Sequence, residues 1–136
     1  MGLKEQRALE QFQDHSYDYF KKKIDEAAGF EVEIDIDWDK LIEEDMSHML
    51  EENLPQIYFE PIIEGFQKIC RDEMGRRTLK KNLQKIVITN ESGYSSPDAA
   101  INFSDGVLTI DHLPNTNMND EESRASRIEE VVSRNE

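Results

Sequence analysis

Residues 30–39 read FEVEIDIDWD, and this stretch decides the fold class. Its apolar side chains alternate with acidic ones, which is the period of a β-strand that has one buried face and one solvent face. The apolar positions are Phe30, Val32, Ile34, Ile36 and Trp38, and the acidic positions are Glu31, Glu33, Asp35, Asp37 and Asp39. The sequence therefore predicts a half-buried strand with carboxylates along its outer face.

The residues on either side of this strand have helical spacing. An amphipathic helix is predicted over residues 3–28, with Leu9, Phe12, Phe20 and Ile24 on its apolar face and Gly29 placed to end it. After the strand, Asp37 or Asp39 is expected to cap a second helix that stops near Asn53 and Pro55. The apolar stripe of this second helix is Leu41 or Ile42, Met46, Met49 and Leu50.

The stretch from residue 55 to residue 84 has a broken helical pattern. Pro61 is expected to begin a helix, because a proline inside a helix removes a hydrogen bond and clashes with the preceding turn. Gly75 is expected to end that helix before a short one over residues 76–84.

The C-terminal half predicts strands, a turn and a final helix. Residues 86–88 form a short β-type run, and the Gly-, Ser- and Pro-containing residues 90–97 form a loop. An Asp105–Gly106 turn predicts a hairpin in which Phe103 faces Leu108 and Ile101 faces Ile110. A polar linker over residues 114–118 leads to a helix capped by Asn119, with the apolar stripe Ala125, Ile128, Val131 and Val132.

These elements indicate an α+β fold with a small, mostly antiparallel sheet covered on one face by helices. About four strands are expected, the hairpin included. Residues 1–114 are predicted to form one α+β domain. Residues 115–136 are predicted to form the linker and the amphipathic helix, docked on the same domain or on a second subunit, so the protein is expected to be a monomer or a homodimer.

The charge and composition restrict the partners. The chain has 136 residues, 37% of them hydrophobic, and a formal net charge of −14, which repels nucleic acid and anionic lipid. No apolar run is long enough to span a bilayer, and the N-terminal residues lack the apolar segment of a signal peptide. Cys70 is the only cysteine, so no internal disulfide is possible. We therefore expect a cytoplasmic protein.

The alternating carboxylates suggest a function. Side chains on one face of a strand are about 6.6–6.8 Å apart, close to twice the ~3.4 Å rise per nucleotide of one DNA strand. The row Glu31, Glu33, Asp35, Asp37 and Asp39 is therefore a candidate binding face for a basic protein partner, as in an inhibitor-type or other protein-interaction module. The alternative is an ordinary solvent face.

The basic residues are segregated from the acidic ones. Residues 30–64 have twelve acidic side chains and one Lys, whereas residues 65–89 have seven basic and two acidic side chains. The second segment lacks the interleaved aromatic residues of an RNA platform, so it is expected to compensate the acidic segment within the fold.

The sequence does not predict a metal site, a cofactor or a catalytic residue. Glu44, His48 and Glu52 share one helical face, but they lack the second helix of ligands that a di-iron site needs. Cys70 is expected to be a small buried apolar residue. The competing hypothesis is a small hydrolase or ligand-binding domain in which His112 and Asp111 act with the loop over residues 90–97.

Overall fold

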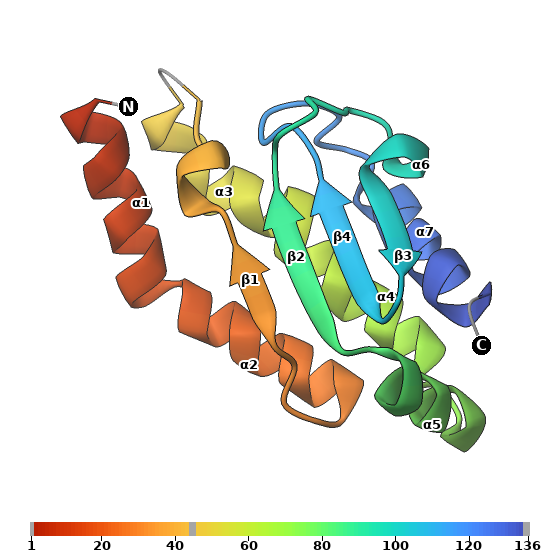
Figure 1. The fold of residues 1–136 in the computed structure, drawn as a ribbon. Helices are drawn as coiled ribbons and strands as arrows, with labels where there is room; N and C mark the ends of the chain where they lie inside the picture. Colours follow the sequence, from red (N-terminus) through yellow and green to blue (C-terminus); the bar gives the residue numbers. More distant parts are fainter. Residues whose placement is uncertain (1, 44–45, 135–136) are drawn as a thin grey trace.

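The computed structural model describes residues 2–43 and 46–134, and it confirms the α+β class. The described residues form a four-stranded sheet in the order β1-β2-β4-β3 (Figure 1). The strands are β1 (Ile34–Ile36), β2 (Lys85–Thr89), β3 (Ile101–Ser104) and β4 (Val107–Asp111).

Most of the pairings are parallel, which corrects the expected antiparallel sheet. β1 pairs with β2 and β2 pairs with β4 in parallel, and only β3 and β4 are antiparallel. The helices between β1 and β2 return the chain to the end of the sheet where β1 begins, so β2 can run in the same direction as β1. The hairpin then places β3 at the outer edge, so that β4 lies against β2.

The predicted hairpin is confirmed in register and in turn type. Ile101 pairs with Ile110 and Phe103 pairs with Leu108. Asp105 and Gly106 both have positive φ angles, 52° and 82°, as a type I′ turn requires.

The N-terminal segment is two helices instead of one. They are α1 (Leu3–His15) and α2 (Tyr17–Ala28), with a break at Ser16, and Gly29 ends α2 in the left-handed conformation as predicted. The break brings Tyr17 against Trp38, with ring centroids 5.2 Å apart. Phe12 stacks on Phe59 at 5.8 Å, so these aromatic residues join both helices to the middle of the chain.

The second predicted helix is replaced by shorter elements. These are the 3-10 helices η1 (Trp38–Lys40) and η2 (Ser47–Met49), then α3 (Leu50–Leu54). The Asp37 side chain does not cap η1, and Glu44 and Asp45 lie outside the described residues. Pro55 does not end the helix, because a π-helical turn, η3 (Pro55–Phe59), leads directly into α4 (Glu60–Ile69), where Pro61 is the second residue.

Gly75 is inside a helix and does not end one. α4 ends at Ile69, and Asp72 caps the next helix, α5 (Glu73–Asn82), by accepting a hydrogen bond from the Gly75 N–H at 2.8 Å. A Cβ atom at Gly75 would lie 1.6 Å from the Ile69 carbonyl oxygen. Glycine is therefore needed here for close packing of the backbone.

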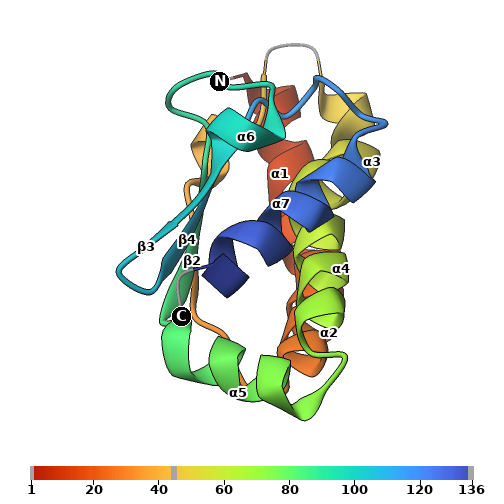
Figure 2. The ribbon, with the colours of Figure 1, turned by 90° about the vertical axis from the view of Figure 1, so that its right-hand side faces the viewer.

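The helices cover one face of the sheet. Figure 2 shows α1, α2, α4 and α7 (Glu121–Arg134) on one side of the strands, and no helix of the described chain packs along the other side. Another short helix, α6 (Pro97–Ala100), precedes β3. The predicted stripe of α7 is buried, and α7 packs on α4 and β3. The backbone N–H of Arg124 donates to the Asp120 carbonyl, so Asp120 and not Asn119 is the residue that caps α7.

Candidate functional site

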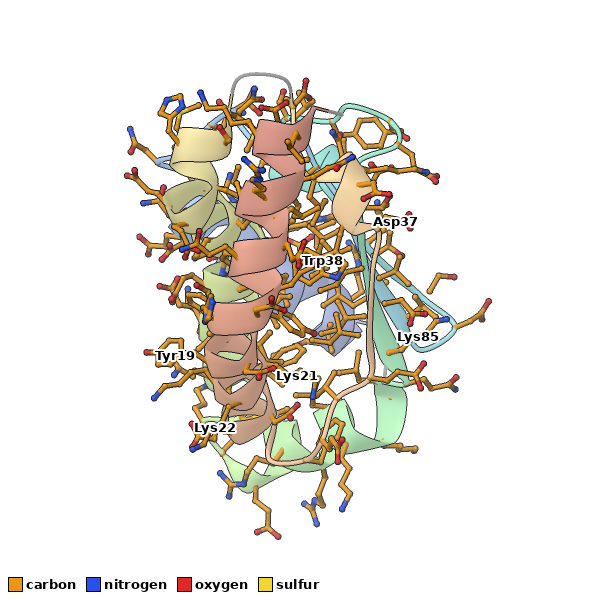
Figure 3. The ribbon with its side chains drawn as sticks, turned by 90° about the vertical axis from the view of Figure 1, so that its left-hand side faces the viewer. Tyr19, Lys21, Lys22, Asp37, Trp38 and Lys85 are labelled. Carbon is orange, nitrogen blue, oxygen red and sulfur yellow. The ribbon has the colours of Figure 1, made fainter. Side chains whose placement is uncertain are left out.

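The open face of the sheet carries three of the five predicted carboxylates. Glu33, Asp35 and Asp37 are exposed, whereas Ile34 and Ile36 between them are partly buried against the helical layer. Asp37 lies on the side of the sheet away from the helices, as does Lys85 of β2 (Figure 3). We call Glu33, Asp35 and Asp37 the acidic row.

The other two predicted carboxylates do not extend this row along the strand. Trp38–Lys40 form η1, so strand geometry ends before Asp39, which lines a surface pocket with Gln6, Glu10 and Gln13 of α1. Glu31 is exposed but lies three residues before the start of β1, whereas Glu33 directly precedes that strand. The tertiary structure therefore turns Asp39 toward the helical side of the molecule.

Two members of the acidic row have partners across the sheet. Lys85 Nζ lies 3.0 Å from Asp35 Oδ2, and Thr89 Oγ1 donates to Asp37 Oδ2 at 3.0 Å. Within the described part of the chain, no ion pair involves Glu33. Asp35 is therefore paired with a lysine, whereas Glu33 is exposed without an ion pair to any described residue.

Further charged groups gather beyond the carboxyl end of the acidic row. Lys40 Nζ lies 2.5 Å from Glu91 Oε1 and 3.9 Å from Asp37 Oδ2. The hydrogen bond to Glu91 is the main cause that raises the pKa of Lys40. Asp111 Oδ1 accepts the N–H groups of Glu91 and Ser92, which holds the loop after β2 against β4. Glu91 and Asp111 were not predicted for this surface, because their position depends on the parallel pairing of β2 with β4.

The basic segment was expected to compensate the acidic residues 30–64, and Lys85 does so by pairing with Asp35. Arg71 instead pairs with a residue outside that segment, because its Nη1 lies 3.2 Å from Glu129 Oε2. Arg77, Lys80 and Lys81 of α5 are exposed and form no ion pair with any described residue. The molecule therefore presents a basic helix at one end of the fold as well as an acidic row on its open sheet face.

His112 and Asp111 lie in different environments. His112 has no exposed surface, and its Nδ1 lies 2.6 Å from the Leu113 carbonyl oxygen. Burial is the main cause that lowers the pKa of His112, so the ring is neutral at neutral pH. Asp111 instead binds the backbone of the loop after β2. A general base must reach solvent or substrate, and this geometry therefore does not favour the hydrolase hypothesis.

The other candidates for chemistry offer no assembled centre. In the described ranges, no group of three or more His, Cys, Asp or Glu residues is arranged to hold a metal ion. Cys70 is only partly buried, and this burial raises the pKa of its thiol. No helix in residues 2–43 or 46–134 is long and apolar enough to cross a membrane.

A pair of carboxyl groups lies where α4 meets the start of α7. Burial, a hydrogen bond with Glu64 and the charges of Glu64 and Glu60 raise the pKa of Glu121 from its ordinary value of 4.5 to about 7. Because the folded-state pKa is above the unfolded one, the folded protein binds more protons between these two values. Glu121 therefore lowers the stability of the fold progressively as the pH rises from about 4.5 to about 7.

Replacing Glu121 with Gln is expected to make the protein about 0.5–1 kcal/mol more stable than the wild type at pH 8, where the Glu121 carboxyl is ionised. At pH 5 this difference should disappear, because Glu121 is then protonated in the folded wild type. Urea unfolding at the two pH values measures the change. Glu122→Gln is the control, since it removes the same charge from the first turn of α7 without the Glu64 contact. An equal gain at pH 5 and pH 8 would contradict the coupling between Glu64 and Glu121.

The fold and the surface define a class of protein: a small α+β protein with a mixed sheet, helices on one face and an exposed acidic row on the other. Comparison of the chain with protein-family models, curated proteins and solved structures finds no match.

Proposed function

We propose that this protein is a protein-interaction module, of inhibitor type, that binds a basic partner through the open face of its sheet. The acidic row supplies the charge, since Glu33, Asp35 and Asp37 lie on one exposed face that no helix of the described chain covers. Such a surface steers a cationic protein toward the sheet and increases the association rate. The reducing cytoplasm is the proposed compartment, in keeping with a single, unpaired cysteine.

The observation that supports this proposal most directly is the alternation of burial along β1. Like charges side by side on one face of a strand lower its stability. Lys85 offsets this repulsion at Asp35 and Lys40 offsets it at Asp37, whereas Glu33 has no ion pair with any described residue. Uncompensated negative charge therefore remains at Glu33, and a cationic partner would offset it.

The test neutralises the acidic row without changing its shape. The variant Glu33→Gln, Asp35→Asn, Asp37→Asn is expected to weaken partner binding roughly tenfold or more at low salt. Its free energy of unfolding should stay within about 1 kcal/mol of the wild type, because the ion pairs that it removes are exposed. The partner is isolated from native-source lysate on immobilised protein and eluted with a salt gradient, and its affinity is then measured by calorimetry.

A matched triple variant separates the acidic row from net charge. Glu10→Gln, Asp14→Asn, Asp18→Asn removes the same charge from exposed positions on α1 and α2. This control is expected to keep at least about half of the wild-type affinity, because α1 and α2 lie on the other side of the sheet from the open face (Figure 2). Equal losses in the two triple variants, or no loss in either, would overturn the proposal.

A further inference from the structure

β1 is an edge strand, and the hydrogen bonds of the sheet show which of its peptide groups are free. The Glu33 carbonyl accepts from Ile86 N–H at 2.9 Å, and the Asp37 N–H donates to the Ile88 carbonyl at 3.0 Å. In a parallel pair the N–H and C=O of one residue point to the same side, and the side alternates along the strand. The peptide groups of residues 33, 35 and 37 therefore face β2, and those of Ile34 and Ile36 point away from the sheet.

The outward peptide groups have no partner. In the part of the chain that the structure describes, no hydrogen bond involves the N–H or C=O of Ile34 or Ile36. Figure 3 views the molecule from the β1 side, and no helix or strand crosses in front of β1, which lies beside α1 and α2. An unpaired edge of this kind is a template for another strand.

The opposite edge of the sheet is closed in part by a side chain. Arg127 Nε donates to the Ile101 carbonyl of β3 at 3.1 Å, and its Nη2 donates to the Asp98 carbonyl at 3.2 Å. This contact occupies an outward carbonyl of β3, because Ile101 and Ile110 are a pair whose peptide groups face away from each other. β1 is thus the more open of the two edges.

Charge decides what can pair with β1. Side chains on the same face of neighbouring strands lie about 4.5–5.5 Å apart, so an added strand would place alternate residues beside Glu33, Asp35 and Asp37. A second copy of β1 would bring carboxylates against carboxylates, which is unfavourable. A strand with Lys or Arg at alternate positions would form ion pairs with the row instead.

We infer that the outer edge of β1 is a binding site for an extended, basic segment of the partner, which adds to the sheet as a further strand. This inference rests on the proposed function. The backbone of Ile34 and Ile36 supplies hydrogen bonds that are independent of sequence, and the acidic row selects cationic residues on the open face.

The probe is a short synthetic peptide that alternates Lys and Val, and the readout is amide hydrogen exchange of the full chain by NMR. Peptide binding is expected to slow the exchange of the Ile34 and Ile36 amides roughly tenfold or more, because their N–H groups become hydrogen-bonded. The Asp37 amide is the internal control, since it already donates to Ile88. A peptide with the same residues but with every backbone nitrogen methylated should bind roughly tenfold more weakly, although it keeps the Lys charges.

The outcomes separate the inference from the proposed function. The edge site is overturned if the alternating peptide does not bind, if bound peptide leaves Ile34 and Ile36 unprotected, or if the methylated peptide binds equally well. In each of these cases the neutralised acidic row can still weaken binding of the natural partner, and the proposed function then stands. If the peptide slows amide exchange at Ile34 and Ile36 equally in the wild type and in the neutralised triple variant, strand addition at the edge of β1 is supported. That result would overturn the selection of cationic residues by the acidic row.

Discussion

Replacing Arg124 with Met is expected to lower the free energy of unfolding by about 3 kcal/mol, because the buried guanidinium donates to two backbone carbonyls. Arg124 has no exposed surface. Its Nη1 atom donates to the Asn117 carbonyl at 2.9 Å, and its Nη2 atom donates to the Gln56 carbonyl at 3.3 Å. Met occupies a similar apolar volume, so the variant removes the donors with little loss of packing.

The Gln56 carbonyl needs Arg124 because of the proline that follows it. In the π-helical turn, the Glu60 N–H donates to the Pro55 carbonyl. The next donor in the same pattern would be residue 61, which is Pro and has no N–H. The Arg124 guanidinium donates to the Gln56 carbonyl instead, and the variant would remove this partner from a partly buried carbonyl.

Urea unfolding, followed by the fluorescence of Trp38, measures the loss at Arg124. The matched control is Arg134→Met, also on α7, where the side chain is 59% exposed and pairs with Glu130 at 3.4 Å. The control should change stability by less than about 0.5 kcal/mol. A loss below about 1 kcal/mol at Arg124 would contradict the argument, since it would mean that the two carbonyls are equally well hydrated in the variant.

Replacing Gly65 with Val is expected to destabilise the fold by about 2–3 kcal/mol through overpacking of α4 against α7. A Cβ atom at Gly65 would lie 2.9 Å from Ile128 Cγ2 and 3.1 Å from the Ala125 carbonyl oxygen. The backbone carbonyl cannot move without displacing α7. Val has a higher helix propensity than Gly, so any loss of stability comes from this contact.

Gln67→Val is the control for Gly65→Val, because Gln67 is an exposed position on the same helix. It should change the thermal midpoint only slightly. Shortening Ile128 to Ala removes the branched side chain that meets the new Cβ atom, so Gly65→Val should cost less in an Ile128→Ala background. If Gly65→Val lowers the stability equally in the wild type and in the Ile128→Ala variant, contact with the Ile128 side chain is not the cause of the loss.

Local patterns predicted those parts of the fold that depend on local geometry. The alternation over residues 30–39 and the Asp105–Gly106 turn each specify a conformation within a few residues. The turn is found as predicted, whereas the strand is found only over Ile34–Ile36 and is shorter than predicted. The end of α2 at Gly29 belongs to the same group. The break at Ser16 and the continuation of the helix through Pro55 were missed, because packing of the aromatic residues and an i→i+5 turn override local propensity there.

The candidate site was predicted in part for the same reason. The acidic row follows from the two-residue period of a strand, so Glu33, Asp35 and Asp37 share a face as expected. Asp39 does not belong to the row because β1 ends before it. Asp111 contacts the loop after β2 because β4 lies next to β2 in the sheet. These are contacts between distant parts of the chain, and no local period encodes them.

The amino-acid sequence alone determined the α+β class, the hairpin register and the alternation that separates carboxylates from core, because each follows from patterns that are local in the sequence: the periods of successive elements, the Asp105–Gly106 turn and the two-residue alternation. Only the tertiary structure decided the strand order, the free edge of β1 and the burial of His112 and Arg124. The physical reason is that burial and pairing of a residue depend on every element packed around it. The local sequence allows a polar side chain to lie either in solvent or in the core, and the elements that pack around it determine which of the two occurs.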